Sequence, residues 1–184
     1  MKRKIMGITT AVLMLALVGC GKADVTEVAD TAVSASAEVT AEATTEMETR
    51  EFQGITFEFD KSYTKVDEKT DTNFTYAAYL MDAANSTSFN IVVENLPADI
   101  TLEKYMELSF GGSGMVADSE ETVEKNGITW SVVSTNNQGL KLDQHTFIEN
   151  KKAYIFTYAS MPDGYDALYD TYLKIIDSVK LTEK

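Results

Sequence analysis

Short stretches of alternating apolar and polar side chains recur through the chain after about residue 50. Residues 54–59 alternate apolar with polar positions, which is the period-two pattern of a half-buried strand. Residues 73–82 and 88–96 have the same character and are separated by the turn-forming residues 84–86. The pattern therefore predicts three strands, of which the last two are adjacent in sequence.

Two hairpins follow further along the chain. Asn126 and Gly127 stand between two strand-forming runs within residues 120–134, and Asn-Gly readily takes the positive φ angles that a tight hairpin turn needs. Residues 140–149 and 152–160 predict a second hairpin that turns at residues 150–151. Strands joined by such short turns must be antiparallel.

Two segments have the pattern of helices. Residues 101–110 begin with Thr101, which can cap the first turn, and Glu103 suits the positive end of the helix dipole. Residues 164–181 carry apolar side chains at steps of three and four, with charged ones on the other side. We expect this strongly amphipathic helix to cover one face of the sheet. Together these elements predict an α+β domain, an antiparallel β-sheet flanked by helices.

The N-terminus has the pattern of a secretory signal. A basic start at residues 1–4 precedes an apolar run at residues 5–18, which is too short to cross a bilayer. Leu17-Val18-Gly19-Cys20 resembles the lipobox of bacterial lipoproteins. The resemblance implies cleavage between Gly19 and Cys20, and a diacylglyceryl group with palmitate on Cys20. The alternative is an ordinary secreted protein with an incidental cysteine.

The domain organisation follows from these signals. Residues 1–19 are the predicted signal peptide, and 20–50 are the lipidated cysteine followed by a tether. Residues 21–50 contain no aromatic residue and have seven acidic against two basic ones, a composition that cannot bury enough surface to order itself. Residues 51–184 are expected to form one domain.

The predicted domain resembles the PsbP-like fold. The resemblance rests on residues 54–59, 94–109, 152–160 and 165–181. It implies an α/β/α sandwich that acts as a binding or assembly module rather than as an enzyme. No binding residue of the family can be carried over to this sequence.

Charge narrows the range of partners. The whole chain has a formal net charge of −13, and removal of the three basic signal residues gives 13 − 29 = −16. Such a surface repels nucleic acid and anionic lipid headgroups, so acyl chains would have to hold the protein at the membrane. A basic partner or a loosely held cation stays open, while solubility is the simplest reason for the charge.

The single histidine, His145, is the first candidate for chemistry. Strand alternation places it on one face with Asp143 and Phe147, so Asp143 and His145 could form a hydrogen-bonded pair or half of a metal site. A zinc site needs three or four ligands, and the mature chain offers no second histidine or free cysteine. We therefore expect no metal and no cofactor, and a surface or rim histidine paired with a carboxylate.

Other motifs give no catalytic signature. No Gly-x-Ser-x-Gly elbow is present, and residues 110–115 lack the ending of a phosphate-binding loop. Residues 117–125 are acidic but lack calcium-loop spacing, and are interpreted as a charged strand edge. Trp130 and Phe156 are expected in the core. Tyr154 and Tyr158 are weak binding candidates, because a phenol can be half exposed.

Three functions are consistent with the sequence. The first is a lipid-anchored extracytoplasmic binding or assembly module with an unknown protein partner at the cell surface. The second is an accessory lipoprotein of a membrane transporter that binds a small ligand or cation. The third, an envelope hydrolase, is the least supported, so the chain is not expected to be an enzyme.

Overall fold

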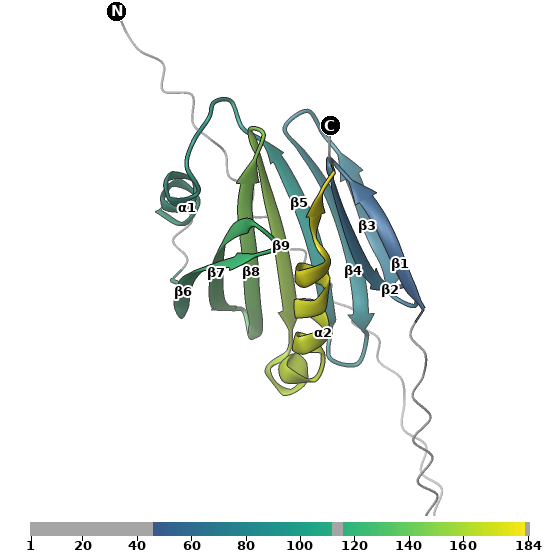
Figure 1. Cartoon of the computed structure of the whole chain (residues 1–184). Helices are drawn as coiled ribbons and strands as arrows, with labels where there is room; N and C mark the ends of the chain where they lie inside the picture. Colours follow the sequence, from purple (N-terminus) through teal and green to yellow (C-terminus); the bar gives the residue numbers. More distant parts are fainter. Residues whose placement is uncertain (1–45, 112–115, 183–184) are drawn as a thin grey trace, which may run out of the picture.

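The computed structural model describes residues 46–111 and 116–182 of the 184-residue chain. Two sheets and two α-helices make up this part (Figure 1). The elements are β1 (Met47–Phe52), β2 (Ile55–Asp60), β3 (Thr64–Thr70), β4 (Phe74–Asp82), β5 (Thr87–Asn95), α1 (Leu102–Gly111), β6 (Ser119–Lys125), β7 (Ile128–Asn137), β8 (Leu140–Glu149), β9 (Lys152–Ser160), a short 3₁₀ turn (Pro162–Gly164), α2 (Tyr165–Ser178) and β10 (Lys180–Leu181).

All strand pairs in both sheets are antiparallel. The large sheet has the order β3-β4-β5-β9-β8-β7-β6, and the small sheet has the order β1-β2-β10. The strands predicted from alternation are present as β2, β4, β5 and β6 to β9. Strands β1, β3 and β10 were not predicted.

The two predicted hairpin turns are confirmed. Asn126 and Gly127 join β6 to β7 with φ angles of 54° and 72°. Asn150 and Lys151 join β8 to β9 with φ angles of 49° and 59°. Positive φ at both central residues gives a turn whose twist matches that of the strands, which is why these two-residue loops are tight.

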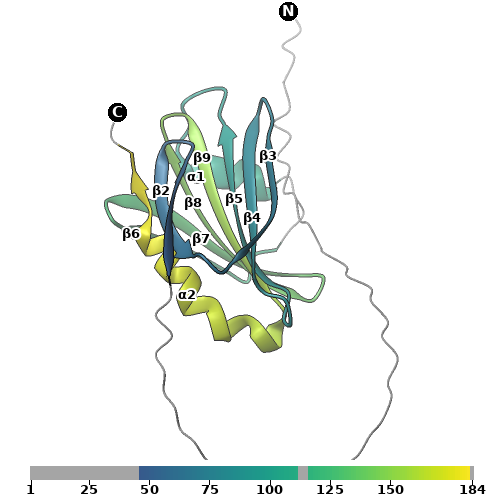
Figure 2. The same ribbon diagram turned by 90° about the vertical axis from the view of Figure 1, so that its right-hand side faces the viewer.

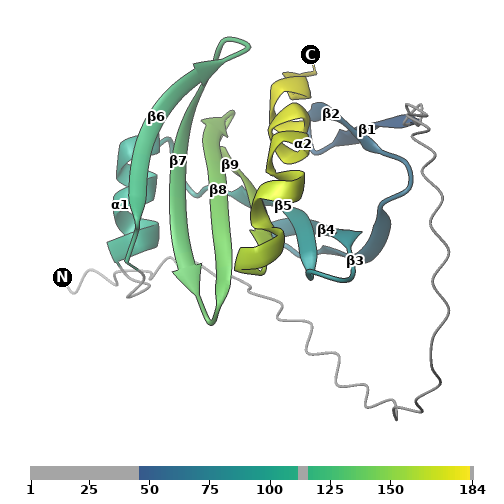
Figure 3. The same cartoon turned by 90° about the horizontal axis from the view of Figure 1, so that it is seen from below.

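The large sheet lies between two unequal layers. Figure 3 shows it curling around α2, while α1 lies on its outer side; in Figure 2, α1 lies behind the strands and α2 in front of them. The inner face packs against α2 and the small sheet around buried rings that include Phe57, Phe89, Trp130 and Phe156. The outer face forms a smaller core with α1. The chain therefore has the predicted α+β architecture, an antiparallel sheet flanked by helices.

The folded domain begins earlier than position 51. Strand β1 starts at Met47, so the last residues of the segment predicted as a tether belong to the domain. Arg50 explains why. Its guanidinium lies over the ring of Phe52, hydrogen-bonds the Tyr79 hydroxyl and pairs with Glu68 at 2.5 Å, and these contacts hold β1 against β3 and β4.

Several sequence predictions lie outside the described residues. They are the signal peptide, Gly19 and Cys20, most of the tether, and residues 112–115 of the glycine-rich segment. Among the helices within residues 46–111 and 116–182, none is long and apolar enough to span a membrane.

Candidate functional site

Asp143 and His145 lie next to each other on β8, as strand alternation predicted. Their side chains face α2, and the two residues are only 1% and 2% exposed. The Nδ1 atom of His145 is 2.9 Å from Oδ1 of Asp143, and Ser134 Oγ donates to Oδ2 at 2.9 Å. The expectation of a surface or rim histidine is wrong, because β8 is an interior strand and α2 covers its inner face.

Tyrosines of α2 and β9 surround this pair. The Tyr172 hydroxyl is 3.2 Å from His145 Nδ1 and donates to the carbonyl of Phe156. Burial, followed by the charge of Asp143, raises the pKa of Tyr172 and of Tyr169 well above the usual value. These phenols stay neutral at physiological pH, so the cluster is a set of protonated hydrogen-bonding groups around one buried carboxylate.

The geometry of this cluster favours a structural role. Both residues of the pair are buried, and the rings of Trp130 and Tyr172 both make edge contacts with the His145 imidazole. A substrate could reach them only if α2 moved. Within the part of the chain that the structure describes, no three His, Cys, Asp or Glu side chains are grouped to hold a metal ion.

The two tyrosines singled out as binding candidates are also in the core. Tyr154 donates its hydroxyl to the carbonyl of Gln53 at 2.9 Å, and Tyr158 donates to the carbonyl of Tyr165 at 2.7 Å. Burial raises the pKa of Tyr158 to about 12. Neither ring is open to a partner. Trp130 and Phe156 are fully buried, which confirms their predicted place.

The acidic stretch at residues 117–125 contains an edge strand, as predicted. Within residues 46–111 and 116–182, strand β6 ends the large sheet and pairs with β7 alone, and most of its side chains are exposed. A row of carboxylates on such an edge opposes pairing with another chain.

Pairing between two neighbouring strands of the large sheet stops before the strands end, which leaves main-chain N–H and C=O groups without a strand partner. Strands β7 and β8 pair from Asn137↔Leu140 to Ser131↔Thr146 and then separate. Beyond that point β7 continues along β6 to Ile128, and β8 continues along β9 to Glu149. We call the space between residues 128–130 and 147–149 the β7–β8 opening.

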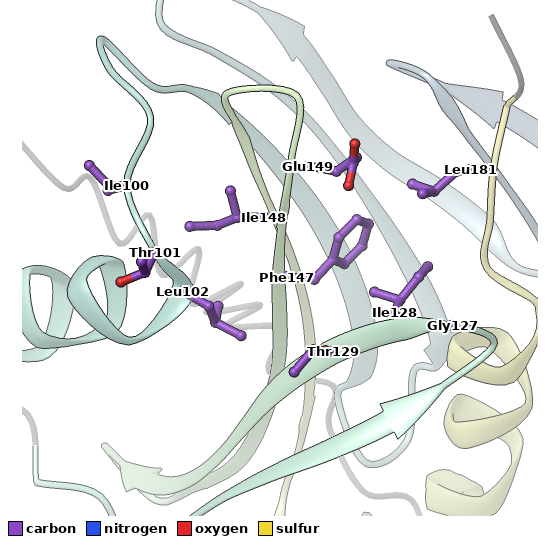
Figure 4. A pocket seen from close by; sticks show the side chains of 10 residues that line it. All are labelled: Ile100, Thr101, Leu102, Gly127, Ile128, Thr129, Phe147, Ile148, Glu149 and Leu181. Atoms are coloured by element: carbon purple, nitrogen blue, oxygen red, sulfur yellow. The ribbon is translucent and has the colours of Figure 1, made fainter.

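Contacts at the end of the β6–β7 hairpin account for the separation. Lys125 Nζ lies 2.7 Å from Asp177 Oδ1, and Asn126 Nδ2 donates to the carbonyl of Asp177. Asp177 is on α2, so these bonds draw the hairpin toward the helix and away from β8. Figure 4 shows β7 sweeping toward α2 while β8 runs on straight.

The β7–β8 opening is a pocket of about 340 Å³. Figure 4 shows its side chains on both sides of β8, with the start of α1 on one side and β10 on the other. Six of its ten lining residues are apolar, and Glu149 carries the one ionisable side chain among them. The lining residues are Ile100, Thr101, Leu102, Gly127, Ile128, Thr129, Phe147, Ile148, Glu149 and Leu181.

A pocket with six apolar side chains, two threonines and a single carboxylate is suited to binding rather than to bond breaking. Glu149 is half-buried, and no second ionisable group in the lining could complete an acid–base pair. No sequence pattern predicted this site. Its residues belong to strands and a helix that alternation predicts well, but nothing local shows that two neighbouring strands separate.

Comparisons with known proteins show the fold. No protein-family model and no curated protein matches the sequence. Among solved structures, the chain is similar to cyanobacterial PsbP (CyanoP) from Synechocystis sp. PCC 6803, with a TM-score of 0.57 and 12% identity, covering 79% of this chain and 98% of that one. It is also similar to PA94, a Pseudomonas aeruginosa protein of unknown function (TM-score 0.51, 11% identity, 75% and 99% covered).

A mutant of the protein Mog1 is a third similar structure, with a TM-score of 0.50, 12% identity, and 76% and 97% of the two chains covered. Identity this low carries no information about function. The likeness over three quarters or more of this chain shows the fold alone. The chain therefore has a PsbP-like α+β sandwich fold.

Proposed function

We propose that this protein is a lipid-anchored extracytoplasmic module that binds or assembles with a protein partner. The observation that carries the proposal is the β7–β8 opening, a pocket of mixed polar and apolar lining where two neighbouring strands cease to pair. The lipid anchor rests on Leu17-Val18-Gly19-Cys20. Acylation of Cys20 with two chains would give a stable attachment, since a single chain binds membranes only marginally.

The position of the opening is consistent with this role. The chain enters the domain at Met47, which pairs with Asp60 at one end of β2. Leu181 lines the opening and pairs with Ile55 at the other end of β2, close to the C-terminus marked in Figure 1. A six-residue strand spans about 20 Å. A tether that enters at Met47 would therefore leave the opening on the far side of the domain.

The second candidate is an accessory lipoprotein that binds a small ligand. The pocket volume of about 340 Å³ favours it, because small-molecule sites start near this size. The hydrolase alternative gains no support, since Asp143 and His145 are packed beneath α2.

Photo-crosslinking in intact cells tests the proposal. Benzoylphenylalanine would be placed singly at Thr129, in the opening, and at Lys69, on β3; both positions are exposed. We expect a discrete crosslinked envelope protein from at least one position. If both positions yield only uncrosslinked protein at native expression levels, the proposed binding function is wrong.

A further inference from the structure

We propose that the β7–β8 opening receives an extended segment of the partner as an added strand, with an apolar side chain in the hollow and a basic side chain beside Glu149. This inference deepens the proposed function and rests on it. It names where the partner binds and the chemistry that the partner must present.

The first support is the unpaired backbone. Continuing the β7–β8 register would pair Trp130 with Phe147, Thr129 with Ile148 and Ile128 with Glu149, and these three pairs are missing. The same residues are paired on their other sides, to β6 and to β9. Because alternate residues of an antiparallel strand turn their N–H and C=O to opposite neighbours, the main-chain groups of Thr129 on β7 and of Ile148 on β8 are the ones directed into the opening. Free strand edges are templates for an incoming strand, and main-chain hydrogen bonds supply much of its affinity.

The second support is the lining. Phe147 and Ile128 are buried at the inner side of the opening, and Ile148 with Leu102 forms an apolar wall on the α1 side. An extended strand sends alternate side chains to opposite faces. An apolar residue of the partner could therefore pack on one face of the opening, while its neighbours point to the other.

The third support is charge. Among the described residues no Lys or Arg forms an ion pair with Glu149. Of the two lysines that follow it, Lys151 lies 3.5 Å from Asp99 and Lys152 donates to the carbonyl of Gln53. A cationic side chain of the partner could therefore form an ion pair with Glu149 without displacing a lysine or arginine of the described residues. The net charge of −13 also speeds the approach of a basic segment.

The outer edges of the large sheet suit strand addition less well. Strand β3 has charged side chains of both signs, is exposed along its whole length, and is interrupted by an irregularity between Lys65 and Asp67. Strand β6 is acidic. Charges and bulges on edges discourage pairing, so the β7–β8 opening, with one carboxylate in its lining, is the favoured place for an added strand.

Peptide binding tests the inference directly. The probe is a capped seven-residue peptide of alternating valine and lysine, titrated into the processed lipoprotein in detergent micelles. Trp130 is the chain's only tryptophan and its ring lies 4.6 Å from Phe147, so its fluorescence reports on the opening. We expect a saturable change with the lysine peptide and none with a peptide N-methylated at alternate residues, which cannot pair as a strand.

Charge reversal at Glu149 is the matched variant. We expect Glu149→Lys to weaken binding of the lysine peptide by about two- to fivefold, the scale of a partly exposed ion pair, and to strengthen binding of the glutamate counterpart. Glu48→Lys makes the same charge change on exposed β1 and should leave both affinities unchanged. Melting curves show whether each variant is folded, and Glu149→Gln replaces Glu149→Lys if the latter unfolds.

Four outcomes of the peptide-binding, oligomerisation and crosslinking experiments would contradict strand addition in the β7–β8 opening. Equal binding of the N-methylated peptide would show that no strand is added, and equal effects of Glu149→Lys and Glu48→Lys would remove the role of Glu149. A concentration-dependent dimer that Thr129→Arg abolishes would identify a second copy as the occupant. Crosslinks in cells from Lys69 but not from Thr129 would leave the proposed function standing and place the partner elsewhere.

Discussion

At the scale of single residues, the Asp143–His145 pair shows how burial changes the meaning of a suggestive motif. In an exposed cleft the pair could take part in acid–base chemistry. Here each side chain is almost completely buried, and tyrosine hydroxyls and Ser134 complete its surroundings. The pair therefore joins β8 to β7 and to α2, and we infer a structural role for it.

Removal of the carboxylate tests that role. We expect Asp143→Ala to lower the free energy of unfolding by about 3 kcal/mol, because it leaves the buried Ser134 hydroxyl without its acceptor and removes the carboxylate beside the buried His145 ring. Chemical denaturation measures the change. Asp166→Ala, on the exposed side of α2, is the control and should change stability by less than about 0.5 kcal/mol. Similar values for the two variants would contradict the structural interpretation.

At the scale of elements, local patterns predicted the long strands and both helices. Capping of α1 is also confirmed, since the backbone N–H of Lys104 donates to Thr101 Oγ1 at 3.2 Å. The missed strands lack such patterns. Every residue of β3 is exposed, and β10 is two residues long and exists only because it pairs with β2. No apolar alternation marks strands of this kind.

The packing of helix α2 against the sheet can be tested by a substitution in its buried face. Ile176 is fully buried against the inner core, so we expect Ile176→Asp to unfold the domain or to cost at least about 4 kcal/mol. Lys174→Asp places the same side chain on the exposed face of α2 and should leave the domain folded. Circular dichroism melts compare the two, and matching melts would mean that α2 is misplaced.

At the scale of the whole molecule, the proposed anchor decides where the acidic domain acts. We expect Cys20→Ser to move the protein from the membrane fraction to the soluble extracytoplasmic fraction, because the proposed diacylglyceryl group is attached through the cysteine sulfur, which serine lacks. Cell fractionation and mass spectrometry of the N-terminus measure this. Gly21→Ala keeps the cysteine and is the control. Retention of Cys20→Ser at the membrane would show that another element holds the protein there.

The sequence by itself determined the α+β class, the hairpin turns at Asn126–Gly127 and residues 150–151, and the amphipathic α2, because each depends on neighbours within a few positions. Tertiary structure decided the rest. His145 was predicted at the rim of the sheet, but packing of α2 on β8 buries it. The bonds from Lys125 and Asn126 to Asp177 join distant segments and separate β7 from β8, so the opening has no local sequence pattern.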